Sequence, residues 1–249
     1  MVYSRGKRMS EVAAANIEYD NGVIHTLDSV LLPPDGVNDT LLDLGLTYLY
    51  GALQETDLTT DVATADGITV FVPTNQAFID VGQQLQDLSA QDLSTILQFH
   101  VVPSVAYTTD LADGDTLDTL ANTEYNSQID IHVDENDGAL YASNARVITA
   151  NILLSNGVAH LIDEVLNPNE DAEDYYGYEL GDDGNGVPAF EDAASATIPA
   201  LTSGVTATGS YEPTSTFSAV SGAEAAHGKY QAEILGGALA AGALGIIMA

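Results

Sequence analysis

Apolar and polar positions in the first part of the chain follow two periods, one typical of helices and one typical of strands. In Asp39–Gln54 apolar residues recur every three or four positions, which predicts a single helix. The β-branched and aromatic run Gly67–Val72 predicts a buried strand. Further helices are expected over Thr74–Gln86 and after Ser89, with Thr74 and Ser89 as N-cap residues.

The pattern changes to strands further along. Ile129–Val133 alternates between apolar and polar residues, Asp134–Gly138 is typical of a turn, and Ala139–Ile152 is expected to return as further strand. Helices followed by hairpins predict the α+β class.

An internal repeat organises the chain. Ala15–Pro33 and Ala150–Pro168 match at 11 of 19 positions, with an offset of 135 residues. The Asn-Gly pair in each copy predicts a hairpin turn, and so long an offset indicates a domain period. Residues 1–34 are therefore expected to end one domain, whose earlier part lies upstream, and residues 35–170 to form a complete second domain.

The composition shifts after Pro168. Asp171–Asp192 is rich in acidic residues and glycine, which predicts a flexible linker. Ala193–Gly222 holds 12 Ser or Thr residues and is expected to be an extended stalk, open to O-glycosylation. The whole segment 171–222 is thus predicted to lack a fold.

The end of the chain has the pattern of a lipid-anchor signal. The small residues Ser221, Gly222 and Ala223 precede a polar spacer and the uncharged tail Ile234–Ala249, which together make residues 223–249 a predicted GPI-attachment signal. The alternative is an apolar helix packed on the domain. A tail of 16 residues is shorter than the roughly 20 that span a bilayer.

Charge narrows the function further. The 37 acidic residues face 5 basic ones, a net charge of −32. Such a surface repels phosphate, which excludes nucleic acid and anionic membranes as partners. It fits either a self-repelling secreted surface or adaptation to high salt.

The candidate chemistry is sparse. His25 with Asp28, and His160 with Asp163, have the spacing of a metal or acid–base pair on a helix, but on strands residues three apart lie on opposite faces. The register of Asp134–Gly138 does not fit a calcium loop. With no nucleophile and no cofactor motif, we expect a non-enzymatic protein without metal or cofactor.

Three segments, in order, resemble the signatures of fasciclin domains: Thr69–Phe78, Leu97–Pro103 and Ser155–Leu166. The resemblance implies a β-wedge flanked by helices, secretion, and a role in adhesion between cells or to matrix. In animal members a Tyr-His pair is linked to integrin binding, and here it is Phe99-His100. These two residues are candidate binding residues, although His100 also fits a core histidine. Asn38 begins the only N-glycosylation sequon.

Together these features predict an extracellular, GPI-anchored module of adhesion or of cell-wall and matrix organisation. Its expected partners are a cell-surface or matrix protein or glycan, and the outer membrane leaflet through the lipid. A secreted module that binds carbohydrate or a small ligand remains an alternative, as does an acidic surface protein of a halophile.

Overall fold

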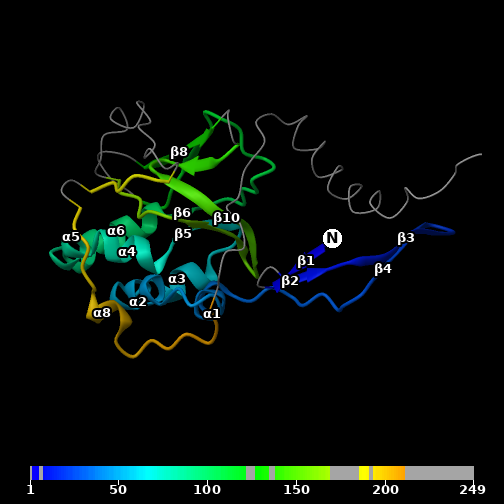
Figure 1. Cartoon of the computed structure of the whole chain (residues 1–249), viewed down its shortest axis with the longest axis horizontal. Helices are drawn as coiled ribbons and strands as arrows, with labels where there is room; N and C mark the ends of the chain where they lie inside the picture. Colours follow the sequence, from blue (N-terminus) through cyan, green and yellow to red (C-terminus); the bar gives the residue numbers. More distant parts are fainter. Residues whose placement is uncertain are drawn as a thin grey trace, which may run out of the picture.

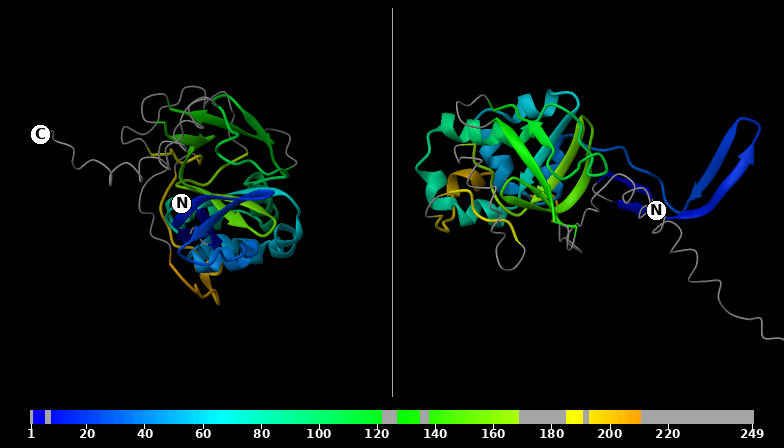
Figure 2. Two further views of the ribbon diagram at one scale, coloured as in Figure 1. Left: turned by 90° about the vertical axis from the view of Figure 1, so that its right-hand side faces the viewer. Right: turned by 90° about the horizontal axis from the view of Figure 1, so that it is seen from above.

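An N-terminal segment of two hairpins extends away from a mixed body of helices and sheet (Figures 1 and 2). The computed structural model describes residues 2–5, 8–121, 127–134, 138–168, 185–190 and 193–210. In the projecting segment, β1 (Val2–Ser4) pairs with β2 (Arg8–Ser10), and β3 (Val12–Tyr19) pairs with β4 (Gly22–Leu27), both in antiparallel fashion.

The body is built on a seven-stranded sheet in the order β6-β5-β11-β10-β9-β8-β7. Its strands are β5 (Ile68–Pro73), β6 (Val101–Val102), β7 (Thr116–Asp118), β8 (Gln128–Val133), β9 (Leu140–Ala142), β10 (Ala145–Leu154) and β11 (Gly157–Ile162). The pairs are antiparallel except β5 with β11, which run parallel. The expected α+β class is thereby confirmed.

Strand β5, which lies between β6 and β11, is buried along its whole length because both faces of the sheet are covered. Val70 and Val72 point into one apolar core, which the helices share. Phe71, between them, points into a second core with residues of β8, β9 and β10. The alternation of side chains along one strand therefore divides the interior in two.

Short helices cover one side of the sheet (Figure 1). They are α1 (Val37–Asp43), α2 (Thr47–Glu55), α3 (Thr59–Thr64), α4 (Asn75–Asp80), α5 (Gly82–Gln86), α6 (Ala90–Phe99) and α8 (Pro199–Thr202). The N-cap predictions are confirmed, since the Thr74 and Ser89 hydroxyls accept hydrogen bonds from the backbone N–H groups three residues on.

Two predicted elements are interrupted by single residues with positive φ. The single helix expected over 39–54 is wrong: it breaks into α1 and α2 at Gly45, whose φ is 73°. The strand expected over 139–152 is likewise divided into β9 and β10 by a turn at Ser143, whose φ is 49°. Both conformations leave regular structure, so each ends the element before it.

The segment 193–210, here called the C-terminal strap, packs on the helices. Its residues Ile198 and Leu201 are buried in the helix-side core. Its backbone bonds to α5 through Gln83 N–H to the Ala194 carbonyl, and to the end of α1 through Thr208 N–H to the Leu42 carbonyl. The expectation of an unfolded segment is therefore wrong for 193–210 and for 185–190, where Ala189 is buried. Residues 171–184 and 211–222 lie outside the described part.

Candidate functional site

The candidate binding pair Phe99-His100 ends helix α6, and both side chains are 1% exposed. Phe99 packs in the second apolar core with Phe71. His100 Nδ1 donates to the Ile96 carbonyl at 2.8 Å, and Nε2 accepts the Leu166 N–H at 3.0 Å. A neutral ring thus joins the end of α6 to the segment after β11, which matches the core-histidine interpretation, and neither side chain offers a surface to a partner.

Burial lowers the pKa of His100 from 6.5 to about 4, and the hydrogen bond to Ile96 opposes this only in part. In the unfolded chain the ring takes up a proton below about pH 6.5, whereas the folded protein resists it down to about pH 4. The contribution of the neutral His100 ring to stability is therefore fully present above pH 6.5, and it is lost as the pH falls toward 4.

We expect His100 to lower the free energy of unfolding by about 2 kcal/mol between pH 7 and pH 5. Urea titrations at pH 7 and pH 5 give the change in the free energy of unfolding for the parent chain and for His100→Gln. The difference between these two changes measures the contribution of His100. Equal pH dependences in the two chains would contradict a buried neutral ring.

A second buried histidine anchors the loop that leads from β6 toward β7. His160 Nε2 donates to the Ala106 carbonyl at 2.9 Å, and Nδ1 accepts the Asn151 N–H at 3.3 Å. The Asn151 amide bonds Thr108 through both of its ends. Thr69 completes this loop-anchoring network, since its hydroxyl accepts the Ala106 N–H at 2.8 Å.

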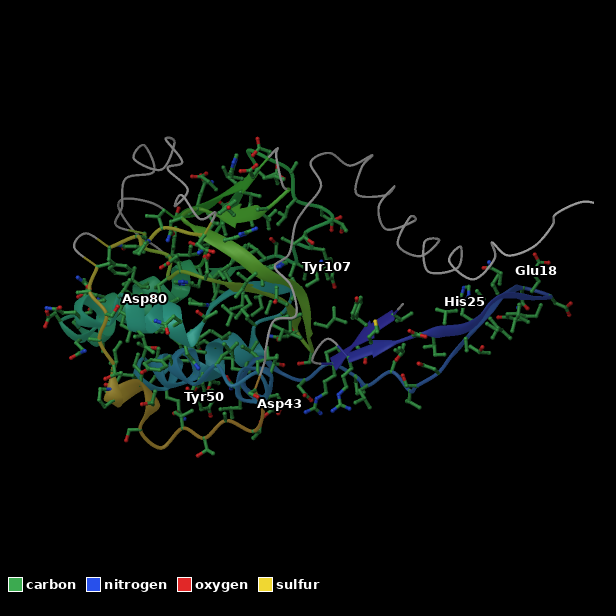
Figure 3. All side chains as sticks on the ribbon, in the orientation of Figure 1. Glu18, His25, Asp43, Tyr50, Asp80 and Tyr107 are labelled. Atoms are coloured by element: carbon green, nitrogen blue, oxygen red, sulfur yellow. The ribbon has the colours of Figure 1, made fainter. Side chains whose placement is uncertain are left out.

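The loop-anchoring network holds two apolar side chains out of the body. Val105 is 42% exposed and Tyr107, labelled in Figure 3, is 37% exposed. They alternate along the loop with Ala106 and Thr108. The backbone N–H groups of these two residues donate to the side chains of Thr69 and Asn151 and hold the loop against the body. Sequence reasoning missed Thr69, Asn151 and Tyr107 as a set; a lone threonine in the apolar run of β5 was the available signal.

His160 and Asp163 do not act as a pair. Asp163 Oδ1 accepts the Arg146 N–H at 2.7 Å and Oδ2 accepts the Gly186 N–H at 2.8 Å, so its carboxylate caps backbone at the far end of β11. Burial raises the pKa of Asp163 although both hydrogen bonds oppose the shift. His160 and Asp163 therefore bond separate backbone groups and not each other.

Glu164 lies beside Asp163 in an unfavourable place for a charge. Its Oε2 is buried, with no hydrogen-bond partner among the described residues. Burial, together with the negative charges of Asp163 and Asp80, raises its pKa from 4.5 to about 8. A folded-state pKa above the unfolded one favours folding below pH 4.5, and this advantage is lost as the pH rises toward 8.

Glu164→Gln is therefore expected to stabilise the protein by about 1–2 kcal/mol at pH 8, a figure reduced for the partial exposure of the side chain. The gain should vanish below pH 4.5, where Glu164 is protonated in both states. Thermal melts at pH 4 and pH 8 measure it, with the exposed Glu55→Gln as control. A stabilisation that did not change with pH would point to packing instead of charge.

The remaining candidate sites fall in different places. Asn38 lies in the first turn of α1, and its Nδ2, the atom to which a glycan would be attached, donates to the Thr59 carbonyl at 3.3 Å. Ser221, Gly222 and Ala223 lie outside the described residues. Across the described ranges, no three His, Asp or Glu side chains are placed to hold a metal ion. Nor is any helix there both long and apolar enough to cross a membrane.

One shallow groove of about 250 Å³ opens between α3 and α6. Its lining is mainly apolar, with one carboxylate and one amide: Leu58, Asp61, Val62, Leu97, Gln98, Val101 and Leu120. Nothing in this set supplies a nucleophile or a general base with a partner to orient it.

The sequence of this chain is similar to the sequences of known proteins. A fasciclin-like arabinogalactan protein of Arthroderma benhamiae is 34% identical over 197 residues, which cover 79% of this chain and 44% of that protein. Transforming growth factor-beta-induced protein ig-h3 of Sus scrofa is 30% identical over 65% of this chain and 23% of its own length. The chain thus spans less than half the length of either relative.

Among solved structures, the chain is similar to a FAS1 domain pair from the insect cell adhesion molecule Fasciclin I. It matches with a TM-score of 0.46 and 21% identity, over 68% of this chain and 62% of that one. The model of the fasciclin domain matches residues 44–168, half of the 249 residues. The chain belongs to the fasciclin domain family.

Proposed function

We propose that this chain is a non-enzymatic adhesion or matrix module that acts outside the cell. The observation that carries the proposal is the loop 104–108, where a buried hydrogen-bond network presents Val105 and Tyr107 to solvent. A pre-ordered loop loses little conformational entropy on binding, and tyrosine supplies contact area at low cost. Family membership supports the adhesive role.

The buried polar groups support the same proposal. The rings of His100 and His160 and the carboxylate of Asp163 all bond backbone groups that hold segments together. These groups stabilise a rigid scaffold, and the interaction with a partner is left to exposed side chains on the outside of the body.

Coated beads test the adhesive surface. Beads that carry the full chain should aggregate with one another or with cells, and Val105→Ser/Tyr107→Ser should abolish this without changing the melting temperature. Val187→Ser, which removes another exposed apolar side chain, is the matched control. Unchanged aggregation by the loop variant would contradict the assignment of the surface. A glycan array probed with both chains shows whether the bound partner is carbohydrate.

We further propose that residues 221–249 direct attachment of a GPI anchor at Ser221, Gly222 or Ala223. The support is the order of small residues, polar spacer and uncharged tail. Phosphatidylinositol-specific phospholipase should release the protein from intact cells. Peptides from Leu235–Ala249 in the released protein would contradict the proposal.

A further inference from the structure

The projecting β3–β4 hairpin exposes an unusual amount of apolar surface. Of the fourteen large apolar side chains that are exposed in the described residues, ten precede residue 34. On the hairpin itself they include Ile17, Tyr19, Val23 and Ile24, each between 44% and 54% exposed. Figures 2 and 3 show this hairpin pointing away from the body, and Figure 3 labels Glu18 near its tip and His25 further back along it.

The same positions are buried in the second copy of the repeat. With the offset of 135 residues, Ile17 corresponds to Ile152, Val23 to Val158 and Val30 to Val165. These three second-copy side chains are at most 1% exposed, whereas Val30 is 84% exposed. The sequence of the first hairpin is therefore suited to an interior that the described residues do not provide.

The internal geometry of the two hairpins is the same. Asn16 and Asn151 both have φ of 57° at a bulge in the ladder. In each copy this asparagine N–H donates to Nδ1 of the paired histidine, at 3.2 Å for His25 and 3.3 Å for His160. The aspartate after each second strand also caps the equivalent backbone N–H, at 2.9 Å from Asp28 and 2.7 Å from Asp163.

The two hairpins differ in the hydrogen bonds that they make to other segments. In the second copy, β11 pairs in parallel with β5, and His160 Nε2 donates to the Ala106 carbonyl. In the first copy, β4 pairs only with β3 within the described residues, and no partner for His25 Nε2 is found there. The ring is nevertheless held by the same Nδ1 bond, so its Nε2 is already oriented to donate.

We propose that the β3–β4 hairpin is the closing hairpin of a second fasciclin-type core, which lies outside residues 1–249. That core supplies a strand that pairs in parallel with Gly22–Leu27, as Ile68–Pro73 pairs with Gly157–Ile162. It also supplies a loop carbonyl that accepts His25 Nε2–H, and a backbone N–H that bonds the Asn16 amide as Thr108 bonds Asn151.

Two positions specify how this core differs from the one in the structure. Ile24 stands where the second copy has the buried Ala159, so the core must be wider there. Thr26 stands where it has the buried Leu161, so the core must accept there a hydroxyl that bonds the Ala14 carbonyl within the hairpin at 3.5 Å. A second copy of this chain cannot serve as this core, because its own β10–β11 hairpin already occupies the position beside β5.

Complementation in trans tests the proposal with residues 35–144 of this chain as the acceptor, a core from which the β10–β11 hairpin has been removed. A peptide of residues 145–168 establishes that the acceptor refolds when its own hairpin is supplied. The full chain should then form a soluble one-to-one complex with the acceptor, measured by size exclusion with light scattering. Ile24→Ala/Thr26→Leu in the full chain should bind at least tenfold more tightly, because it matches the acceptor interior.

Variants show which hairpin makes the complex. Val23→Asp in the full chain should weaken binding at least about a hundredfold by placing a charge in the core. Asp20→Asn, at the turn position that is exposed in both copies, should leave binding unchanged. The proposal is overturned if the peptide rescues the acceptor while neither the full chain nor Ile24→Ala/Thr26→Leu does. It is also overturned if Val23→Asp binds as well as the parent chain, or if the full chain instead pairs with itself through this face.

Discussion

Replacing His160 with alanine is expected to lower the free energy of unfolding of the fasciclin domain by about 3–5 kcal/mol. The substitution leaves the Asn151 N–H and the Ala106 carbonyl without their partner in a site with no exposure to solvent. Each unpaired buried group costs about 1–3 kcal/mol, and the vacated ring volume beside Phe71 adds a cavity cost. Urea denaturation followed by circular dichroism measures the loss.

His25→Ala is the matched control, since the same residue occupies the same place in the first hairpin. His25 is exposed, so its removal is expected to cost less than about 0.5 kcal/mol in the chain of 249 residues. Equal losses for His25→Ala and His160→Ala would show that the bond to Asn16 or Asn151 matters more than burial. A negligible loss for His160→Ala would contradict the loop-anchoring network.

Gly51→Ala is expected to destabilise the protein by about 3 kcal/mol, opposite in sign to the usual effect. Alanine in place of glycine inside a helix normally stabilises by about 1 kcal/mol. Here a β-carbon at Gly51 would overlap the backbone carbonyl of Leu201, so the C-terminal strap must leave α2. Detachment exposes Ile198 and Leu201, whose burial is worth about 1.5–3 kcal/mol each.

Hydrogen exchange locates the change, because residues 193–210 should lose protection in Gly51→Ala while β5 and β11 keep theirs. Leu201→Asp is expected to detach the strap by itself. In a chain that already carries Leu201→Asp, the effect of Gly51→Ala on stability should change sign. In that background Gly51→Ala should stabilise by about 1 kcal/mol. If Gly51→Ala destabilised both backgrounds equally, the strap would not be the cause.

The hairpins were predictable because their signals are local. Asn156-Gly157 sets the turn between β10 and β11, and the alternation in Gln128–Val133 sets which side chains are buried. The N-caps Thr74 and Ser89 are local for the same reason, since each hydroxyl reaches only three residues ahead.

The C-terminal strap was missed because its folding depends on distant residues. Only a few of its side chains, chiefly Ile198 and Leu201, enter the core, and the many Ser and Thr residues around them dominate the composition. What holds it is shape complementarity with Gly51 and Gly82, both of which touch strap backbone. A glycine in a helix signals such a close approach, but sequence alone does not name the segment that approaches.

The loop-anchoring network escaped prediction for a similar reason. Thr69 and Asn151 are more than eighty residues apart, and only the folded sheet brings both to the loop 104–108. The local repeat identified His160 as structural, but its partner Ala106 contributes a backbone carbonyl, which no sequence pattern marks.

The two ends of the described body meet at one carboxylate, and this sets how the protein would carry mechanical load. Arg5, before the projecting hairpin, bonds Asp43 at 2.7 Å, and the Thr208 hydroxyl at the end of the strap bonds the same side chain. Asp43 lies at the end of α1, where the two segments approach the body (Figure 3). If the proposed lipid anchor tethers the C-terminal end, tension between that tether and the N-terminal segment would run through Asp43 and the end of α1. The strap would peel from α1 and α2 before the β5–β11 pair felt a shearing force, so the sheet and its anchored loop would stay intact while the tether lengthened.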